Sequence, residues 1–153
     1  MDYQVELKKI YDQLGDSGII VLATASEDEP TVRSMSYVMV EGKLYFQTES
    51  TMEKAIQMKQ NPKVALCQSN IAIKGTAASR GRILSEKNAA VMELYKKKHR
   101  GSYDAYSHME TGELYEVTPT FITVWTYMEG EPYRIYLDCG KEKAWLEHYE
   151  HSK

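Results

Sequence analysis

Residues 31–48, TVRSMSYVMVEGKLYFQT, decide the expected architecture of the chain. Two apolar runs flank Glu41-Gly42, a pair typical of a tight turn, so the stretch predicts a β-hairpin. A hairpin joins two strands antiparallel, without the helical crossover that a parallel pair needs. Because consecutive strands elsewhere in the chain are also expected to touch directly, the sequence favours an antiparallel barrel over a doubly wound parallel sheet.

The flanking segments supply further strands and a few helices. Upstream, apolar residues at helical spacing predict a helix over about 5–14, and the β-branched run GIIVLATAS predicts a buried strand over 18–26. The downstream elements are expected in this order: helix 51–60, strand 63–69, a long bent strand or hairpin 70–84 with Gly75 and Gly81 as bulges, helix 85–100 from a Ser cap, loop 101–116, paired strands 119–128 and 133–138, and a closing helix 141–151. The chain is therefore expected to form one α+β, mainly β domain over 1–153.

Composition excludes several classes of protein. A net charge of −3 gives no global field for nucleic acid, and no apolar run approaches the length of a membrane span. The N-terminal segment is charged throughout and lacks the apolar region of a signal peptide. Cys67 and Cys139 lie in separate strand-like segments and are expected as buried free thiols. The sequence thus predicts a soluble, cytoplasmic protein without nucleic-acid or membrane partners.

The turn after the hairpin, QTESTMEK (47–54), permits two interpretations. Ser50 and Glu53 fit the S-x-x-E capping box of a helix, in which case Lys54 is a solvated cation. Alternatively, the free N–H groups of the helix N-terminus, the hydroxyls of Thr48, Ser50 and Thr51, and the Lys54 ammonium converge on a phosphate. Residue types alone favour the capping interpretation.

The order of elements and three local motifs resemble the FMN-binding split-barrel family, the pyridoxamine 5'-phosphate oxidase-like proteins. The resemblance covers about residues 5 to 138. In its strongest motif, a strand ending in an aromatic residue and Thr precedes a hydroxyl-bearing turn, a Lys and an Asn-Pro pair. Phe46, Thr48, Ser50, Lys54 and Asn61-Pro62 keep that spacing.

Two weaker motifs lie on neighbouring strands. In TVRSMS (31–36) the family places an Arg whose guanidinium reaches the flavin phosphate, and Arg33 matches it. The next three residues match those that line the flavin ring system. IAIKGTA (71–77) resembles the family strand in which a Gly is followed two positions later by a small residue.

The resemblance implies an antiparallel split β-barrel of six to seven strands with flanking helices, and a homodimer that binds FMN between its subunits. It further implies a small-molecule substrate or electron donor. Trp125 resembles a tryptophan that some relatives send across the dimer interface toward the flavin; simple packing in the core or dimer seam is the alternative. The implied cofactor-binding residues are Arg33, Ser34, Met35, Ser36, Gln47, Thr48, Ser50, Thr51, Lys54 and Trp125.

Departures from the family pattern argue against oxidation of pyridoxamine phosphate. Positions 38–39 are apolar where the oxidase has a further basic residue, and Glu53 stands where it has a second one, with Glu49 nearby. These carboxylates repel a phosphate unless they point away. In the C-terminal segment that grips the oxidase substrate, only Arg134 is a candidate match.

The expected function is therefore that of an FMN-dependent oxidoreductase acting on another small molecule. Since no acid–base group is evident on the flavin face, a non-catalytic FMN-binding or redox-sensing module stays open. A deazaflavin- or haem-binding member of the same fold is the third interpretation. His148 and His151 have a spacing that can bind a metal ion, but no third ligand is near them in the sequence, so no metal site is expected.

Overall fold

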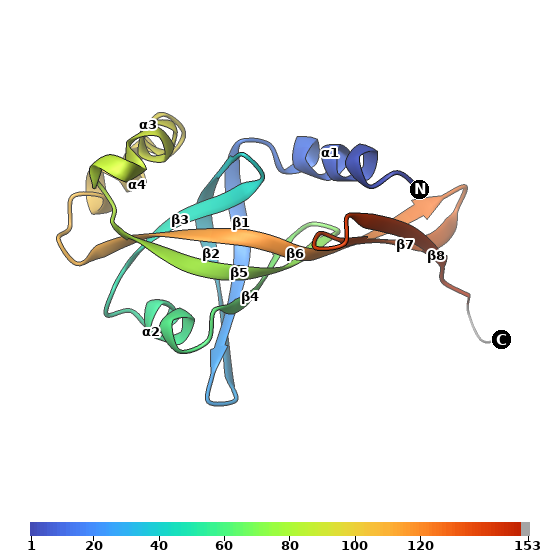
Figure 1. Ribbon diagram of the computed structural model, residues 1–153, viewed down its shortest axis with the longest axis horizontal. Helices are drawn as coiled ribbons and strands as arrows, with labels where there is room; N and C mark the ends of the chain where they lie inside the picture. Colours follow the sequence, from blue (N-terminus) through green and yellow to red (C-terminus); the bar gives the residue numbers. More distant parts are fainter. Residues whose placement is uncertain (151–153) are drawn as a thin grey trace.

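The computed structural model describes residues 1–150 and contains one antiparallel sheet whose eight strands follow the order β3-β2-β1-β4-β5-β6-β7-β8. Since β3 also pairs with β6, six strands close into a barrel, and β7 and β8 extend the sheet beyond it (Figure 1). The expected antiparallel barrel is confirmed. The strands are β1 (Ser17–Ser26), β2 (Glu29–Val40), β3 (Lys43–Glu49), β4 (Lys63–Gln68), β5 (Ile71–Arg82), β6 (Gly112–Met128), β7 (Glu131–Asp138) and β8 (Lys143–His148).

Strand β6 makes the barrel and its extension one structure. One edge of β6 pairs with β5, while the other edge pairs first with β3 and then with β7. The register between β5 and β6 shifts at Lys74/Gly75, where a Cβ atom on Gly75 would come within 2.6 Å of Val117 Cγ1. A second shift lies between Ser79 and Arg82, around Gly81. The irregularities expected at both glycines are therefore confirmed, within a single long strand rather than a hairpin.

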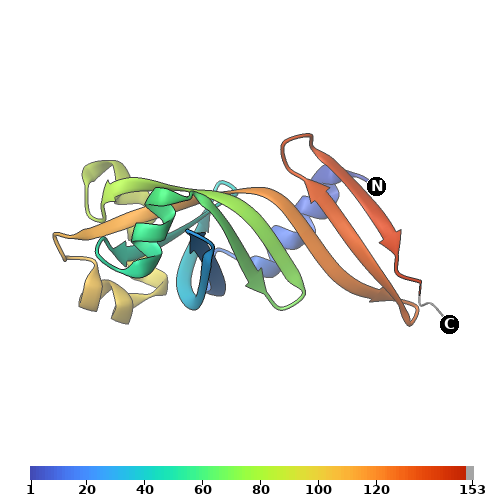
Figure 2. The ribbon, with the colours of Figure 1, turned by 90° about the horizontal axis from the view of Figure 1, so that it is seen from below.

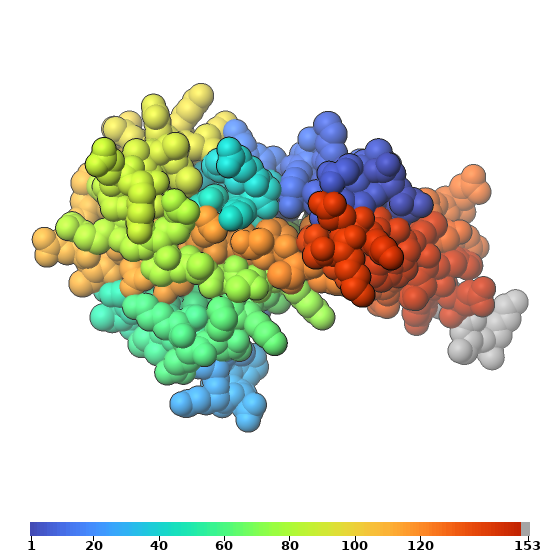
Figure 3. Space-filling model, viewed as in Figure 1, coloured from blue at the N-terminus to red at the C-terminus, as the bar shows by residue number. Residues whose placement is uncertain are grey.

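The helices lie outside the barrel and cover different parts of it. They are α1 (Tyr3–Leu14), α2 (Glu53–Gln60), the 3-10 turn η1 (Glu86–Asn88), α3 (Ala89–Lys98) and α4 (Arg100–Tyr106). Helix α2 packs on β1, α3 packs on β2, and α1 contacts β7 and β8. Figures 2 and 3 show that the molecule is elongated, with α3 and α4 near one end and the β7–β8 extension at the other. No helix within residues 1–150 is long and apolar enough to cross a membrane.

Two apolar clusters hold these layers together. The larger cluster fills the barrel with inward-facing side chains such as Leu22, Phe46 and Ile122, all fully buried. The smaller cluster lies between the outer face of β2–β3 and α3, and includes Val38 and Tyr95. Because side chains alternate along a strand, β3 serves both clusters at once, and residues on its outer face point toward α3 and α4.

The C-terminal segment and the burial of one cysteine differ from the sequence-based prediction. The expected closing helix is wrong: residues 143–148 form strand β8, paired with β7, and Trp145 stacks on Tyr136 at a ring-centroid distance of 5.4 Å. This pairing overrides the helical preference of the segment. His151, the end of that expected helix, lies outside the described residues. Cys67 is exposed and Cys139 is half-buried, so the expected burial of the Cys67 thiol is also wrong.

The region around α3 and α4 also differs. The expected loop 101–116 is wrong, because it contains most of α4 and the start of β6. The expected helix 85–100 is divided into η1 and α3, and the Ser85 hydroxyl makes no capping hydrogen bond. Gly101 and Ser102 suggest a loop in the sequence. In the fold, backbone bonds such as Tyr103 N–H to His99 O continue the helical path past them.

Candidate functional site

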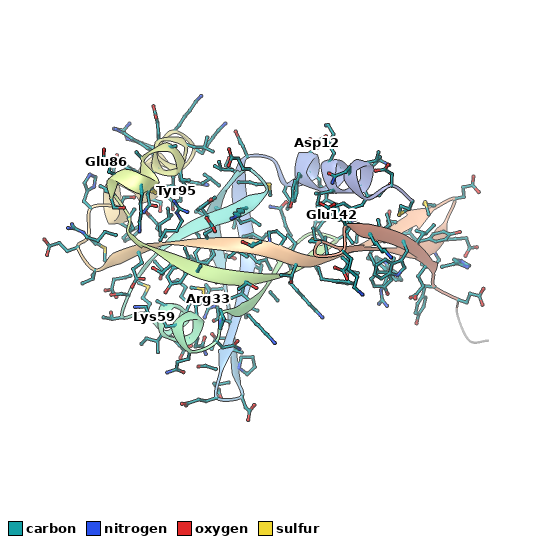
Figure 4. The ribbon with its side chains drawn as sticks, in the orientation of Figure 1. Asp12, Arg33, Lys59, Glu86, Tyr95 and Glu142 are labelled. Atoms are coloured by element: carbon teal, nitrogen blue, oxygen red, sulfur yellow. The ribbon has the colours of Figure 1, made fainter. Side chains whose placement is uncertain are left out.

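A cavity of about 200 Å³ lies between the strands β2 and β3 and the helices α3 and α4. It brings together six of the residues that the sequence predicts for a cofactor site: Ser34, Met35, Ser36, Gln47, Thr48 and Lys54. The other residues that line it come from the turn before α2 and from the α3–α4 region: Glu49, Met52, Ile83, Tyr95, Ser102, Tyr106, Met109 and Gly112. In Figure 4, the labelled Arg33 of β2 lies near α2, and the labelled Tyr95 belongs to α3.

Two cations lie at the α2 end of this cavity, Lys54 in its lining and Arg33 near Lys54. Arg33 Nη1 donates to Thr24 Oγ1 at 2.8 Å and to Leu22 O at 3.3 Å, and Nη2 donates to Thr31 Oγ1. Burial lowers the pKa of both Arg33 and Lys54. The charge of Arg33 lowers the pKa of Lys54 further, whereas the Glu53 carboxylate opposes the shift at Arg33. Among residues 1–150 neither forms an ion pair. An anion is the group that this pair of charges would stabilise.

The turn before α2 is built differently from the expected capping box. Met52 is the N-cap residue of α2 and makes no side-chain capping bond. Thr51 donates instead to the Glu49 carboxylate, through its backbone N–H at 2.9 Å and through its hydroxyl. Hydrogen bonds from Thr51, Thr111 and Ser50 lower the pKa of Glu49. The Ser50–Glu53 capping box is therefore wrong, because Glu49 competes successfully for the hydroxyl groups of the turn.

Gln47 is buried at the base of the cavity, and its amide is bound to α4. Its Nε2 donates to the Ser102 carbonyl and hydroxyl oxygens, both at 3.3 Å, and its Oε1 accepts from the Ser107 hydroxyl at 2.6 Å. The Tyr95 hydroxyl lies 2.9 Å from Ser102 Oγ, which joins α3 to the same network. These bonds fix the position of the two helices against β3.

Sequence reasoning missed the cavity residues contributed by α3, α4 and the turn that follows. They are Tyr95, Ser102, Tyr106 and Met109. Their positions are separated by seven, four and three residues, a helical periodicity that continues from α3 through α4 into the turn after it. That periodicity was the available signal, and the Gly, Ser and Tyr composition of the segment concealed it.

Trp125 lies toward the other end of β6 from Gly112 and is not among the residues that line the cavity. Its ring lies 5.2 Å from the Arg134 guanidinium and makes an edge contact with Tyr127 at 5.8 Å. Arg33, Ser50 and Thr51 do not line the cavity either. The role of Trp125 toward a partner's cofactor stays a prediction.

An exposed apolar face adjoins the cavity on the outside of the barrel. Ser34 stands opposite Val21 on β1, and Val21 stands opposite Cys67 on β4. Ile19, Val21 and Val32 on this face are 55%, 38% and 66% exposed. Because Ser34 and its neighbours belong to the same outer surface, the apolar face and the cavity are continuous.

Comparisons with known proteins agree on this architecture. The family model described as "Pyridoxamine 5'-phosphate oxidase" matches residues 7–126. No curated protein sequence matches the chain.

Three similar solved structures carry different descriptions. A pyridoxamine 5'-phosphate oxidase-related, FMN-binding protein from Nostoc punctiforme has a TM-score of 0.57 and 12% identity, with 97% of this chain and 95% of that chain covered. HutZ, a haem storage protein from Vibrio cholerae, has a TM-score of 0.61 and 17% identity, with 78% of this chain and 91% of that chain covered. PhzG from Burkholderia lata, in complex with tetrahydrophenazine-1-carboxylic acid, has a TM-score of 0.64 and 13% identity, with 98% of this chain and 93% of that chain covered. At such identities these likenesses describe the fold alone.

Proposed function

The chain belongs to the pyridoxamine 5'-phosphate oxidase family, and from this premise we propose that it binds FMN beside β2 and β3 and acts as an oxidoreductase on a small molecule. The observation that carries the proposal is the Arg33–Lys54 pair, two part-buried cations without an ion-pair partner in residues 1–150, next to a largely neutral cavity. A dianionic phosphate joined to a flat ring system has matching chemistry.

The proposed FMN-binding residues fall into two groups, one for the phosphate and one for the ring system. Arg33 and Lys54 bind the phosphate, and Thr48 adds a hydroxyl at the end of β3. Residues 34–36 line the space for the isoalloxazine ring, to whose polar edge the strand backbone donates hydrogen bonds. When bound, FMN supplies the hydride chemistry, and the protein supplies binding, orientation and exclusion of water.

A homodimer is part of the proposal. The cavity of about 200 Å³ in one chain is smaller than the roughly 300–1,000 Å³ of typical ligand pockets, so FMN needs walls from elsewhere. The exposed apolar face around Val21 and Val32 runs directly into the cavity. A second copy of the chain seated on this face buries these side chains and completes both cofactor sites at once.

The absorption spectrum of the purified protein tests the proposal. Flavin bands, and their bleaching by a nicotinamide cofactor followed by turnover of an added acceptor, are the expected result. A haem spectrum without flavin would support the haem alternative instead, and bound flavin that never turns over would support a non-catalytic module. We further expect no conversion of pyridoxamine phosphate by the FMN-loaded protein, because only Arg134 matches the substrate-gripping segment of the oxidase.

A further inference from the structure

The two sides of the cavity differ in charge. Glu49 and Lys54, the charged side chains that line the cavity within the described residues, both belong to the turn side, next to α2. The opposite side carries only neutral side chains. We call this side the helical wall, and its residues are Ile83, Tyr95, Ser102, Tyr106 and Met109.

The helices that carry the helical wall are rich in cations, yet none of these cations lines the cavity. Helix α3 ends in Lys96–Lys98. Lys98 Nζ lies 3.6 Å from an Asp16 carboxylate oxygen, and Arg100 Nε lies 3.1 Å from Asp104 Oδ2. Lys98 and Arg100 are thus paired with carboxylates, and the helical wall of one chain offers no cation of its own to a negatively charged ligand.

The polar atoms of the helical wall are already paired with one another. Ser102 Oγ lies between the Tyr95 hydroxyl at 2.9 Å and Gln47 Nε2 at 3.3 Å. Tyr95 is 1% exposed, whereas Tyr106 is 59% exposed. The buried part of the wall therefore has its polar atoms hydrogen-bonded within the protein, whereas the exposed Tyr106 ring can cover a ligand.

From these observations we propose that the helical wall binds the substrate, and that this substrate is an uncharged, flat, mainly apolar molecule that stacks on Tyr106. A carboxylate or phosphate placed there would lose its water without gaining a partner, which is costly. An aromatic or conjugated neutral ring keeps the gain from apolar burial and from stacking. The inference rests on the proposed function, since it assigns the substrate class of the same site.

A matched pair of ligands tests this inference. Benzamide and benzoate have nearly the same shape and differ in charge at neutral pH. Titrated into the FMN-loaded protein and followed by the flavin spectrum, benzamide is expected to bind about tenfold or more tightly than benzoate. Equal binding of the two ligands, or no binding of benzamide, overturns the inference.

Two substitutions at the exposed Tyr106 sharpen the test. Tyr106→Ala is expected to weaken benzamide about fivefold or more while FMN affinity stays unchanged. Tyr106→Arg is expected to shift the preference toward benzoate, because it adds the missing cation. Trp145→Ala and Trp145→Arg, at an aromatic ring 42% exposed on β8, are the controls. If Tyr106→Ala weakens FMN as much as benzamide, Tyr106 serves the cofactor and the inference fails.

Failure of FMN to bind at all would instead overturn the proposed function and leave the helical wall to be tested by itself. In that case the two ligands are titrated calorimetrically into the apo-protein carrying both Lys54→Ala and Glu49→Gln, which lacks both charges of the turn side. A preference for benzamide would then support the neutral wall, and a preference for benzoate would contradict it.

Discussion

The Ser107 hydroxyl donates a hydrogen bond of 2.6 Å to Gln47 Oε1, which joins the end of α4 to β3 beneath the cavity. Both residues are buried, at 1% and 8% exposure. The Gln47 amide therefore holds the helices in place while its side chain also lines the cavity. The hydrogen bond between Gln47 and Ser107 thus positions the helical wall against β3.

Gln47→Ala is expected to destabilise the protein by about 1–3 kcal/mol, because it removes the hydrogen-bond acceptor of the Ser107 hydroxyl and the donor to Ser102. Urea denaturation measures the loss, and hydrogen exchange is expected to rise in residues 100–107. Gln13→Ala is the control, since Gln13 bonds Asn70 on the exposed surface. Unchanged stability of Gln47→Ala would show that the network does not hold α4.

Arg33→Ala and Lys54→Ala are each expected to weaken FMN by about one to two powers of ten, because a charge-assisted hydrogen bond contributes roughly 1.5–3 kcal/mol. Riboflavin, which lacks the phosphate, should lose far less. Titration of both flavins into the apo-proteins checks this, with Lys63→Ala as the control at an exposed site on β4. Added salt should weaken FMN less in either mutant than in the parent. Equal loss of both flavins would contradict the phosphate assignment.

Glu49→Gln is expected to tighten FMN about three- to tenfold. The change removes a negative charge from the cavity lining, and the amide oxygen that remains can still accept from Thr51. Fluorescence titration of FMN into the apo-protein measures the effect. Glu129→Gln, in the β6–β7 turn, should leave affinity unchanged. Weaker binding by Glu49→Gln would mean that this carboxylate supports the cofactor site.

Val21→Glu is expected to convert the proposed dimer into a monomer and to remove most FMN binding, because it places a charge within the apolar interface. Sedimentation at micromolar concentration, with the bound flavin measured in the same sample, follows both effects. Val5→Glu changes an equally apolar and 51% exposed residue on α1 and should alter neither. A monomer that binds FMN stoichiometrically would contradict the shared site.

Gly75→Ala is expected to destabilise the barrel by about 1–3 kcal/mol, because the new methyl group would meet Val117 Cγ1 at 2.6 Å and Thr118 O at 3.0 Å. Thermal or urea denaturation measures this. Gly101→Ala in α4, where a Cβ atom meets nothing within 4 Å, should be neutral or slightly stabilising. Equal stability of the two variants would show that the bulge relaxes without cost.

The parts of the fold that the sequence predicted correctly are those specified by neighbouring residues. The hairpin through Glu41-Gly42 and the β6–β7 pair depend on short turns and local apolar runs, and both were predictable. Strand β8 depends instead on the free edge of β7, and α4 depends on the buried amide of Gln47. Neither partner is near in sequence, so composition predicted a helix and a loop there.

The candidate site divides in the same way. Thr48 and Lys54 were found because strand, turn and helix follow one another directly. The capping box failed because Ser50 and Thr51 had a competing acceptor in Glu49, a neighbour in sequence that was considered only as a charge near the phosphate. The helical wall was missed because its residues become neighbours of β3 only after the barrel and its two covering helices have assembled.

The closure of the barrel by β3 and β6 also determines when the cavity comes into existence. The hairpins pair residues close in sequence, whereas β3–β6 pairs Phe46 with Tyr115 across all the elements from α2 to α4. Contacts between such distant segments form late, because the chain must first lose the entropy of a long loop. Since Gln47 and Thr48 lie on one side of this seam and Gly112 on the other, folding intermediates that lack it have no binding site. If FMN binds this cavity as proposed, cofactor present during refolding is therefore expected to act only on the closed barrel, slowing its opening while leaving the earlier steps at their own rates.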